Sequence, residues 1–119
     1  MIVRRAQPWL GTLVEIVVEG DDMATLFVAT DHAFARIAAI HNAMSFQSAE
    51  SELTCVNRVA QTGWAMLSSE LADVLHAALG FASASEGLFD PSVASLLVEN
   101  GQLPGHPGFP EKPITNWQA

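Results

Sequence analysis

The chain is poor in basic residues and in cysteine, and both shortages narrow its possible functions. Five Lys and Arg residues stand against 13 Asp and Glu residues, which gives a formal charge of −8 over 119 residues. Proteins that bind nucleic acids draw much of their affinity from Lys and Arg at the phosphates, so no nucleic-acid partner is expected. The single cysteine, Cys55, excludes an internal disulfide and a cysteine-rich metal site. Its position in a helical pattern predicts a small buried side chain rather than a nucleophile.

Targeting signals are also missing from the sequence. The N-terminus carries two arginines but neither a long apolar core nor a small-residue cleavage site, so no signal peptide is predicted. No apolar run approaches the length of a membrane span. We therefore expect a cytoplasmic chain without a membrane span.

Motifs that mark common catalytic sites do not occur either. The chain has no glycine-rich phosphate loop and no G-x-S-x-G elbow, and its four histidines lack the H-x-x-x-H spacing of metal ligands. His41 falls on an apolar stripe and is expected to be a core histidine with satisfied ring nitrogens. His106 lies in a Pro- and Gly-rich stretch and is expected to be solvated. Composition and spacing alone indicate an α+β domain without assigned chemistry.

The secondary-structure pattern is clearer. The Val- and Ile-rich stretch 11–20 begins and ends with a glycine and predicts a strand. Apolar residues at spacings of three and four predict helices, with Ser or Asp at their starts as caps. The predicted elements are a strand over 11–20, a helix over 22–44 capped by Asp21 or Asp22, a short helix from Ser48 or Ser51, an extended piece over 64–68, a helix from Ser68 or Ser69 to before Gly87, and a helix from Asp90 to Gly101.

This order fits a helix-rich α+β fold with one or two strands. Residues 1–103 form the predicted folded region, and residues 104–119 form a Pro- and Gly-rich connector. The helices carry broad apolar faces, while one or two strands offer little sheet to cover them. Further chain or a second copy is therefore expected to contribute to the core.

The stretch "ASEGLFDPSVASLL" over residues 84–97 is the corner between the last two predicted helices. Gly87 suits the left-handed residue that closes a helix, and Pro91 suits the first helical position after an N-cap at Asp90. A helix start directs free N–H groups outward. The Asp90 carboxylate could instead accept hydrogen bonds from ribose hydroxyls or an exocyclic amine, and the backbone at Leu88 and Phe89 could pair with a base edge. Residue physics alone favours the capping role.

Three ordered blocks of the sequence give this corner another interpretation. They are "RRAQPWLGTLVEI", "MSFQSAESELTCVNRVA" and "LSSELADVLHAALGFASASEGLFDPSVASLL". The first is similar to a Met-Gly-Thr strand, and the second to an aromatic followed by Asp-Ser-Glu-Leu and Leu-Asn. The third is similar to a Ser-Pro-Glu-Leu helix that ends in Asp-Gly-Ala-Phe-Asp-Pro-Thr-Val-Gly-Pro-Leu. With these blocks the chain resembles the N-terminal part of the FAD:protein FMN transferases, the ApbE-like flavin transferases.

The resemblance implies a T-fold-related structure in which these blocks help to bind FAD. By motif, Leu10 takes the place of the strand methionine and Phe46 that of the aromatic after the first helix. Leu88, Phe89 and Asp90 take the place of the flavin-binding tripeptide. Leu88 is bulkier than the alanine common at its position and could crowd a ligand. The implied partners are a flavin nucleotide and a flavin-acceptor protein.

The implied reaction transfers FMN from FAD to a Thr or Ser hydroxyl of the acceptor, with Mg²⁺. Family members run to roughly two or three times this length, and are often exported. Their Asp-Leu-Gly-Gly-Ile-Ala-Lys-Gly segment and magnesium ligands do not occur in these 119 residues, so no catalytic or metal residue is assigned. We expect an N-terminal portion that is inactive alone. The alternatives are a non-catalytic remnant that binds flavin or a partner, and one half of a split transferase that associates with itself or with a complementing chain.

Overall fold

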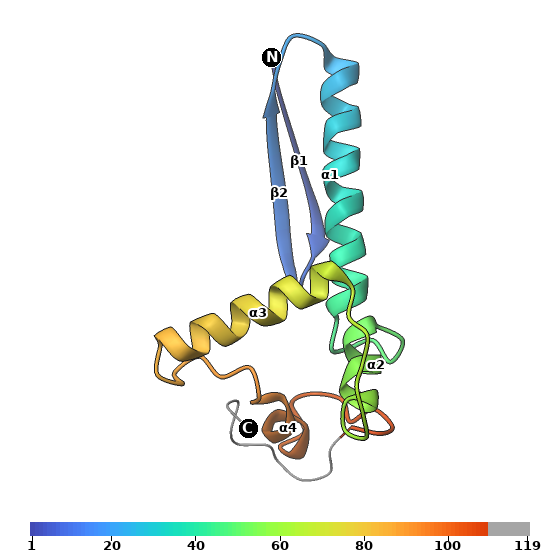
Figure 1. Cartoon of the computed structure of the whole chain (residues 1–119). Coiled ribbons are helices and arrows are strands. Elements are labelled where there is room, and N and C mark those ends of the chain that lie inside the picture. The colour runs from blue at the N-terminus through green and yellow to red at the C-terminus, as the bar shows by residue number, and fades with distance from the viewer. Residues whose placement is uncertain (110–119) are drawn as a thin grey trace. The chain divides into compact units, whose positions relative to one another are not determined.

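The computed structural model describes residues 1–109 and shows the expected helix-rich α+β fold (Figure 1). The described elements are β1 (Ile2–Trp9), β2 (Thr12–Glu19), α1 (Met23–Met44), α2 (Glu52–Val59), α3 (Ser69–Ala84) and α4 (Ala94–Glu99). They belong to two compact units, Met1–Ala43 and a second unit that begins at Met44. The boundary predicted at residue 103 stays a prediction, and most of the connector after it lies outside the described residues.

The first unit opens with an antiparallel hairpin of β1 and β2, in which Val3 lies opposite Val18. β2 confirms the predicted strand, whereas β1 was not predicted. Leu10 and Gly11 form the connecting turn with φ angles of 56° and 73°. Two positive φ angles are typical of the tight type I′ turn, but they are uncommon for leucine. The N–H of Leu10 donates to Nδ1 of His41 at 3.0 Å, so one nitrogen of the half-buried His41 ring has the kind of partner that was predicted.

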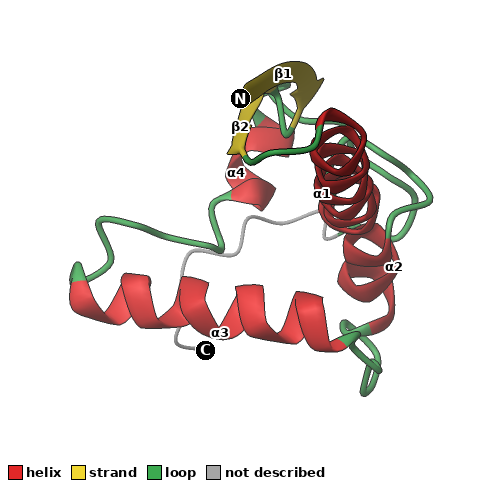
Figure 2. Ribbon diagram, turned by 90° about the horizontal axis from the view of Figure 1, so that it is seen from above, coloured by secondary structure: helices red, strands yellow, loops and turns green. Residues whose placement is uncertain are grey.

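Helix α1 runs beside this hairpin (Figure 1, Figure 2). Leu26, Thr30 and Phe34 are its buried residues, and a spacing of four places them on one side of a helix. Along β1, the residues that alternate with the exposed ones include the buried Val3. The core of the unit therefore lies between this side of α1 and the inner face of the hairpin.

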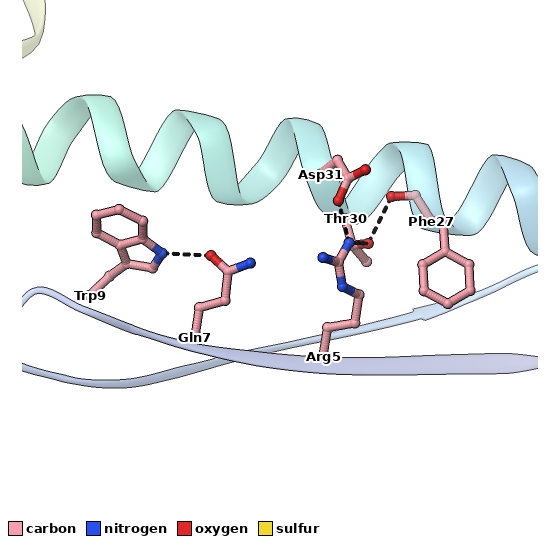
Figure 3. A network of polar contacts seen from close by, with 6 residues as sticks. All are labelled: Arg5, Gln7, Trp9, Phe27, Thr30 and Asp31. Carbon is pink, nitrogen blue, oxygen red and sulfur yellow. Dashed lines mark hydrogen bonds and ion pairs between the residues drawn. The ribbon is translucent and has the colours of Figure 1, made fainter.

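A polar network crosses that core (Figure 3). Nη1 of Arg5 donates to Oγ1 of Thr30 at 2.8 Å and pairs with Asp31. The Thr30 hydroxyl donates in turn to the carbonyl oxygen of Phe27 at 2.9 Å. The Arg5 guanidinium also lies 5.6 Å and 5.7 Å from the ring centres of Phe27 and Phe34, within cation–π range. Arg5 therefore ties β1 to α1 through charge as well as packing.

Among residues 1–109, α1 alone is long and apolar enough to cross a membrane by length and composition. The expectation that no run approaches membrane-spanning length is therefore wrong. Core helices of soluble proteins and N-terminal signal sequences have the same properties. The side of α1 that packs on the hairpin accounts for part of its apolar composition.

Asp22 caps the start of α1, which settles the choice between the two predicted aspartates. Its Oδ2 accepts hydrogen bonds from the backbone N–H of Thr25, at 3.0 Å, and from the Thr25 hydroxyl. Hydrogen bonds to a carboxylate favour its charged form. The bond from the Thr25 side chain, followed by the bond from the Thr25 backbone, therefore lowers the pKa of Asp22 below its ordinary value of 3.8.

This cap predicts a stability difference that depends on pH. Asp22→Ala is expected to lower the melting temperature at pH 7, because the folded state alone holds the carboxylate in these bonds. Since the folded-state pKa is depressed, the contribution is present above about pH 4 and is lost as the pH falls through the folded pKa. Thermal unfolding of wild type and variant from pH 7 to pH 2.5 measures the difference between their melting temperatures. Asp21→Ala is the matched control. If both variants lowered the melting temperature equally, the assignment of Asp22 as the cap of α1 would be contradicted.

Two serines cap α2 and α3 of the second unit, and both were among the predicted caps. Oγ of Ser51 accepts the N–H of Thr54 at 3.1 Å before α2, and Oγ of Ser68 accepts that of Leu71 at 3.2 Å before α3. The Glu52 carboxylate accepts the N–H of Ser68 at 2.8 Å, so the starts of α2 and α3 are adjacent (Figure 2). The predicted extended piece over 64–68 is not a strand, because no strand of this unit lies beside it within the described residues.

The apolar faces of this unit are only partly covered. Leu71 and Ala82 of α3 are buried, whereas the side chain of Phe81 is 66% exposed. Trp64 and Met66 in the loop before α3 are almost fully exposed. The expectation that further protein covers these faces stays a prediction. Cys55 is exposed on α2, so the prediction of a buried thiol is wrong.

Candidate functional site

The corner after α3 closes at Gly87, as predicted. Its N–H donates to the carbonyl oxygen of Ala82 at 2.9 Å, and its φ of 84° lies in the left-handed region that favours glycine. Glu86, one residue earlier, also has a positive φ, of 55°. The chain therefore reverses over two left-handed residues before it reaches Leu88.

Ser85 takes up the backbone donors that follow. Its carbonyl oxygen accepts the N–H of Leu88 at 3.2 Å, and its hydroxyl accepts the N–H of Phe89 at 3.0 Å. The N–H groups of Leu88 and Phe89 therefore have partners within the corner, and the contact of this backbone with a base edge stays a prediction. Within residues 1–109, the carbonyl oxygens of both residues accept no hydrogen bond, so this backbone can still accept.

Asp90 caps one turn rather than a helix. Its Oδ1 accepts the N–H and the hydroxyl of Ser92, at 2.8 Å and 2.6 Å, and its carbonyl oxygen accepts the N–H of Val93 at 3.4 Å. Helix α4 begins only at Ala94, so the predicted N-cap role of Asp90 is wrong. Pro91 has no N–H and the next two are occupied, so the predicted outward-pointing array of free donors is not formed.

A pocket of about 390 Å³ lies beside this corner in the second unit. Small-molecule pockets in proteins begin at roughly 300 Å³ and are mostly apolar with a few polar groups. Aliphatic and aromatic side chains form most of the walls here, and the carboxamides of Asn57 on α2 and of Gln61 just after it add polar groups. The lining residues are Phe46, Leu53, Asn57, Ala60, Gln61, Leu75, Pro91, Ser92, Ala94, Ser95 and Phe109.

The first residues of the connector fold onto this pocket. The ring of Phe109 meets that of Phe46 edge to face, with centres 5.3 Å apart, and Nε2 of His106 donates to the carbonyl oxygen of Phe46 at 2.7 Å. Gln61 donates to the carbonyl oxygen of Gly108, where a side chain would collide because an added Cβ would lie 2.6 Å from Cγ of Arg58. The expectation that His106 is solvated is therefore wrong.

Only one of the five predicted flavin contacts lines the pocket directly, and that residue is Phe46. Asp90 reaches the pocket through Ser92. Leu88 and Phe89 are 93% and 50% exposed at the corner. Leu10 belongs to the first unit, where it is 54% exposed at the hairpin turn. The structure thus groups Phe46 and Asp90 about one pocket and leaves Leu88 open to solvent.

Sequence reasoning missed Phe109, Gln61 and Asn57 as pocket residues. Phe109 follows a glycine in the stretch "HPGF". The Pro and Gly content of this stretch indicated a loop and gave no sign that Phe109 packs on Phe46. Asn57 lies on α2 four residues after Leu53, and that spacing places both side chains on one face of the helix. Gln61 follows after the helix ends at Val59, so helical periodicity could have indicated Asn57 but not Gln61.

Residues 1–109 hold no group of three or more His, Cys, Asp or Glu side chains that could bind a metal ion. A magnesium ion needs oxygen ligands such as carboxylates in a near-octahedral arrangement.

These elements define an α+β fold that is shared with a solved ApbE protein. The crystal structure of the ApbE protein of Thermotoga maritima, at 1.58 Å resolution, matches with a TM-score of 0.76 and 24% sequence identity. The match covers 92% of this chain but 35% of that protein. The sequence model of the ApbE family matches residues 10–113, and the chain belongs to the ApbE family. No curated protein matches it.

Proposed function

We propose that this chain binds FAD as the nucleotide-holding part of an FAD:protein FMN transferase. The observation that carries the proposal is the exposed corner at residues 88–90, joined through Ser92 to a ligand-sized pocket that contains Phe46. Membership of the ApbE family and the shared fold support it.

The chain's own groups suit the contacts that a nucleotide needs. Phe46 offers an aromatic surface for a planar ring. Oδ1 of Asp90 is engaged by Ser92, and its other oxygen accepts no hydrogen bond within the described residues. We propose that this oxygen accepts a ribose hydroxyl or an exocyclic amine, while the carbonyl oxygens of Leu88 and Phe89 accept further ring or sugar donors.

The transfer itself requires more than these residues provide. In the proposed reaction, a Thr or Ser hydroxyl oxygen of the acceptor attacks the FMN phosphorus, its proton is released, and AMP leaves with the electrons of the broken pyrophosphate bond. Such transfers depend on positioning and on neutralising phosphate charge, which Mg²⁺ supplies when bound. The chain spans about 35% of the solved ApbE protein. We therefore propose that the metal ligands come from a further segment or from a complementing chain.

The assignment of Asp90 predicts a loss of FAD affinity. Asp90→Ala is expected to raise the dissociation constant about tenfold to a hundredfold, because hydrogen bonds to a charged group contribute about 1.5–3 kcal/mol. Titration with FAD, followed by flavin fluorescence, measures it. Asp73→Ala, an exposed aspartate on α3, is the matched control. Asp90→Asn keeps a side chain that can form the turn with Ser92, so it separates folding from ligand contact. Equal FAD affinity in all four proteins would leave Asp90 with a structural role only.

A second assay distinguishes the transferase from a binding module. The purified chain is mixed with FAD, Mg²⁺ and an acceptor protein, with and without the C-terminal part of a related ApbE protein. Covalent flavin on the acceptor is expected only when that part is added. Transfer by the chain alone would contradict the proposal that its metal ligands lie elsewhere.

A further inference from the structure

The pocket beside the corner has two aromatic walls that meet at a right angle. The rings of Phe46 and Phe109 make an interplanar angle of 85°. Phe109 is half-buried, and its N–H donates to the carbonyl oxygen of His106 at 3.1 Å. A planar ligand ring beside such a pair can pack on the face of one ring and against the edge of the other, both of which are favourable aromatic geometries.

Several contacts hold Phe109 in this position. The bond from His106 to the carbonyl oxygen of Phe46 anchors one end of the turn at residues 106–109. The bond from Gln61 anchors Gly108, which packs against Arg58 of α2. The second aromatic wall is therefore a fixed part of the unit, and His106 and Gln61 are positioning residues.

The carboxamide of Asn57 lines the pocket without a hydrogen-bond partner among residues 1–109. Nε2 of Gln61 donates to the carbonyl oxygen of Asn57 at 3.0 Å as well as to Gly108. The side-chain carboxamide of Asn57 itself forms no hydrogen bond within residues 1–109, although it is half-buried and lines the pocket. A carboxamide offers a donor and an acceptor side by side, the pattern that pairs with a ring edge carrying one of each.

We propose that this pocket binds a planar heteroaromatic ring, with Phe46 and Phe109 as aromatic walls and Asn57 as the polar group that recognises the ring edge. The inference rests on the proposed function and assigns two further residues to it. A nucleotide such as FAD carries two rings of this kind, the flavin and the adenine, and both have adjacent donors and acceptors on one edge. The volume of about 390 Å³ suits one ring system at a time.

The test compares ring-bearing fragments on defined variants of the chain. Riboflavin and adenosine are titrated separately, in addition to FAD. Phe109→Leu keeps an apolar side chain but removes the aromatic face, and it is expected to weaken binding of one fragment about tenfold, since stacking of a base on an aromatic side chain is a strong contribution. Phe109→Tyr keeps the ring and is expected to bind like wild type.

Asn57→Ala tests the polar contact independently of the connector. It is expected to weaken the same fragment about tenfold, whereas Asn100→Ala at the exposed end of α4 is expected to leave binding unchanged. The fragment that loses affinity identifies the ring. If FAD binds and Asp90→Ala weakens it while Phe109→Leu and Asn57→Ala do not, the pocket assignment is overturned and the proposed function stands. If wild type binds neither FAD nor either fragment, both are overturned.

Discussion

Phe34→Ala is expected to lower the free energy of unfolding by about 3–5 kcal/mol, the usual cost of truncating a buried phenylalanine. The Phe34 side chain is 4% exposed, between α1 and the hairpin. Its loss leaves a cavity and also removes one of the two rings beneath the Arg5 guanidinium. Because small domains are stable by only about 5–15 kcal/mol in total, we expect a large fall in the denaturant midpoint, measured by circular dichroism.

The matched control is Phe81→Ala on α3, where the same side chain is 66% exposed. Surface substitutions usually change stability by less than about 0.5 kcal/mol. The contrast between the two variants therefore isolates burial from residue type. Similar losses in both would mean that α1 does not pack on the hairpin as described.

Leu71→Ala is expected to have a comparable effect in the second unit. Leu71 is 1% exposed in the first turn of α3, and its N–H closes the cap on Ser68. Truncating a buried leucine lowers the free energy of unfolding by about 2–5 kcal/mol. The described part of the second unit has few other buried side chains that could offset this loss. Hydrogen exchange provides the measurement, because amides of α3 should lose protection first.

Leu79→Ala, on the same helix at 46% exposure, serves as the control. Both substitutions replace leucine by alanine in α3, so they change helix propensity equally and differ only in how far the leucine is buried. If Leu79→Ala destabilises the chain as much as Leu71→Ala does, the buried side of α3 has been assigned wrongly.

Helix starts were predictable from the sequence because their caps are local. Asp22, Ser51 and Ser68 each bond to an N–H three residues along, a contact that requires no distant part of the fold. The start of α4 was not predictable in the same way. The carboxylate of Asp90 bonds to Ser92, two residues along, and the helix begins later.

Strand β1 was not predicted because its sequence does not alternate simply between apolar and polar residues. Arg5 and Gln7 occupy the inner face of the hairpin, where a simple pattern requires apolar residues, and Pro8 weakens the strand signal. Residues 2–9 form a strand because they pair with β2 and because Arg5 contacts α1, and these are tertiary interactions. Local propensity does not contain them.

The candidate site was predictable only where a motif marked it. The resemblance indicated Phe46 and Asp90, whose role as flavin contacts stays a prediction; Phe46 lines the pocket, and Asp90 bonds to Ser92 in its wall. Phe109 and His106 were not indicated, because their positions depend on a connector that folds back over about 60 residues of sequence, as the bond between His106 and Phe46 shows. Contacts of such separation leave no periodic trace along the chain.

The exposed thiol of Cys55 gives the protein a single chemically addressable handle. It lies on α2, the helix that also carries Asn57 of the pocket wall. A maleimide dye attached there labels one defined position without any cysteine having to be removed first. Changes in the emission of the dye would then report, in real time, whether a ligand occupies the pocket that Asn57 lines.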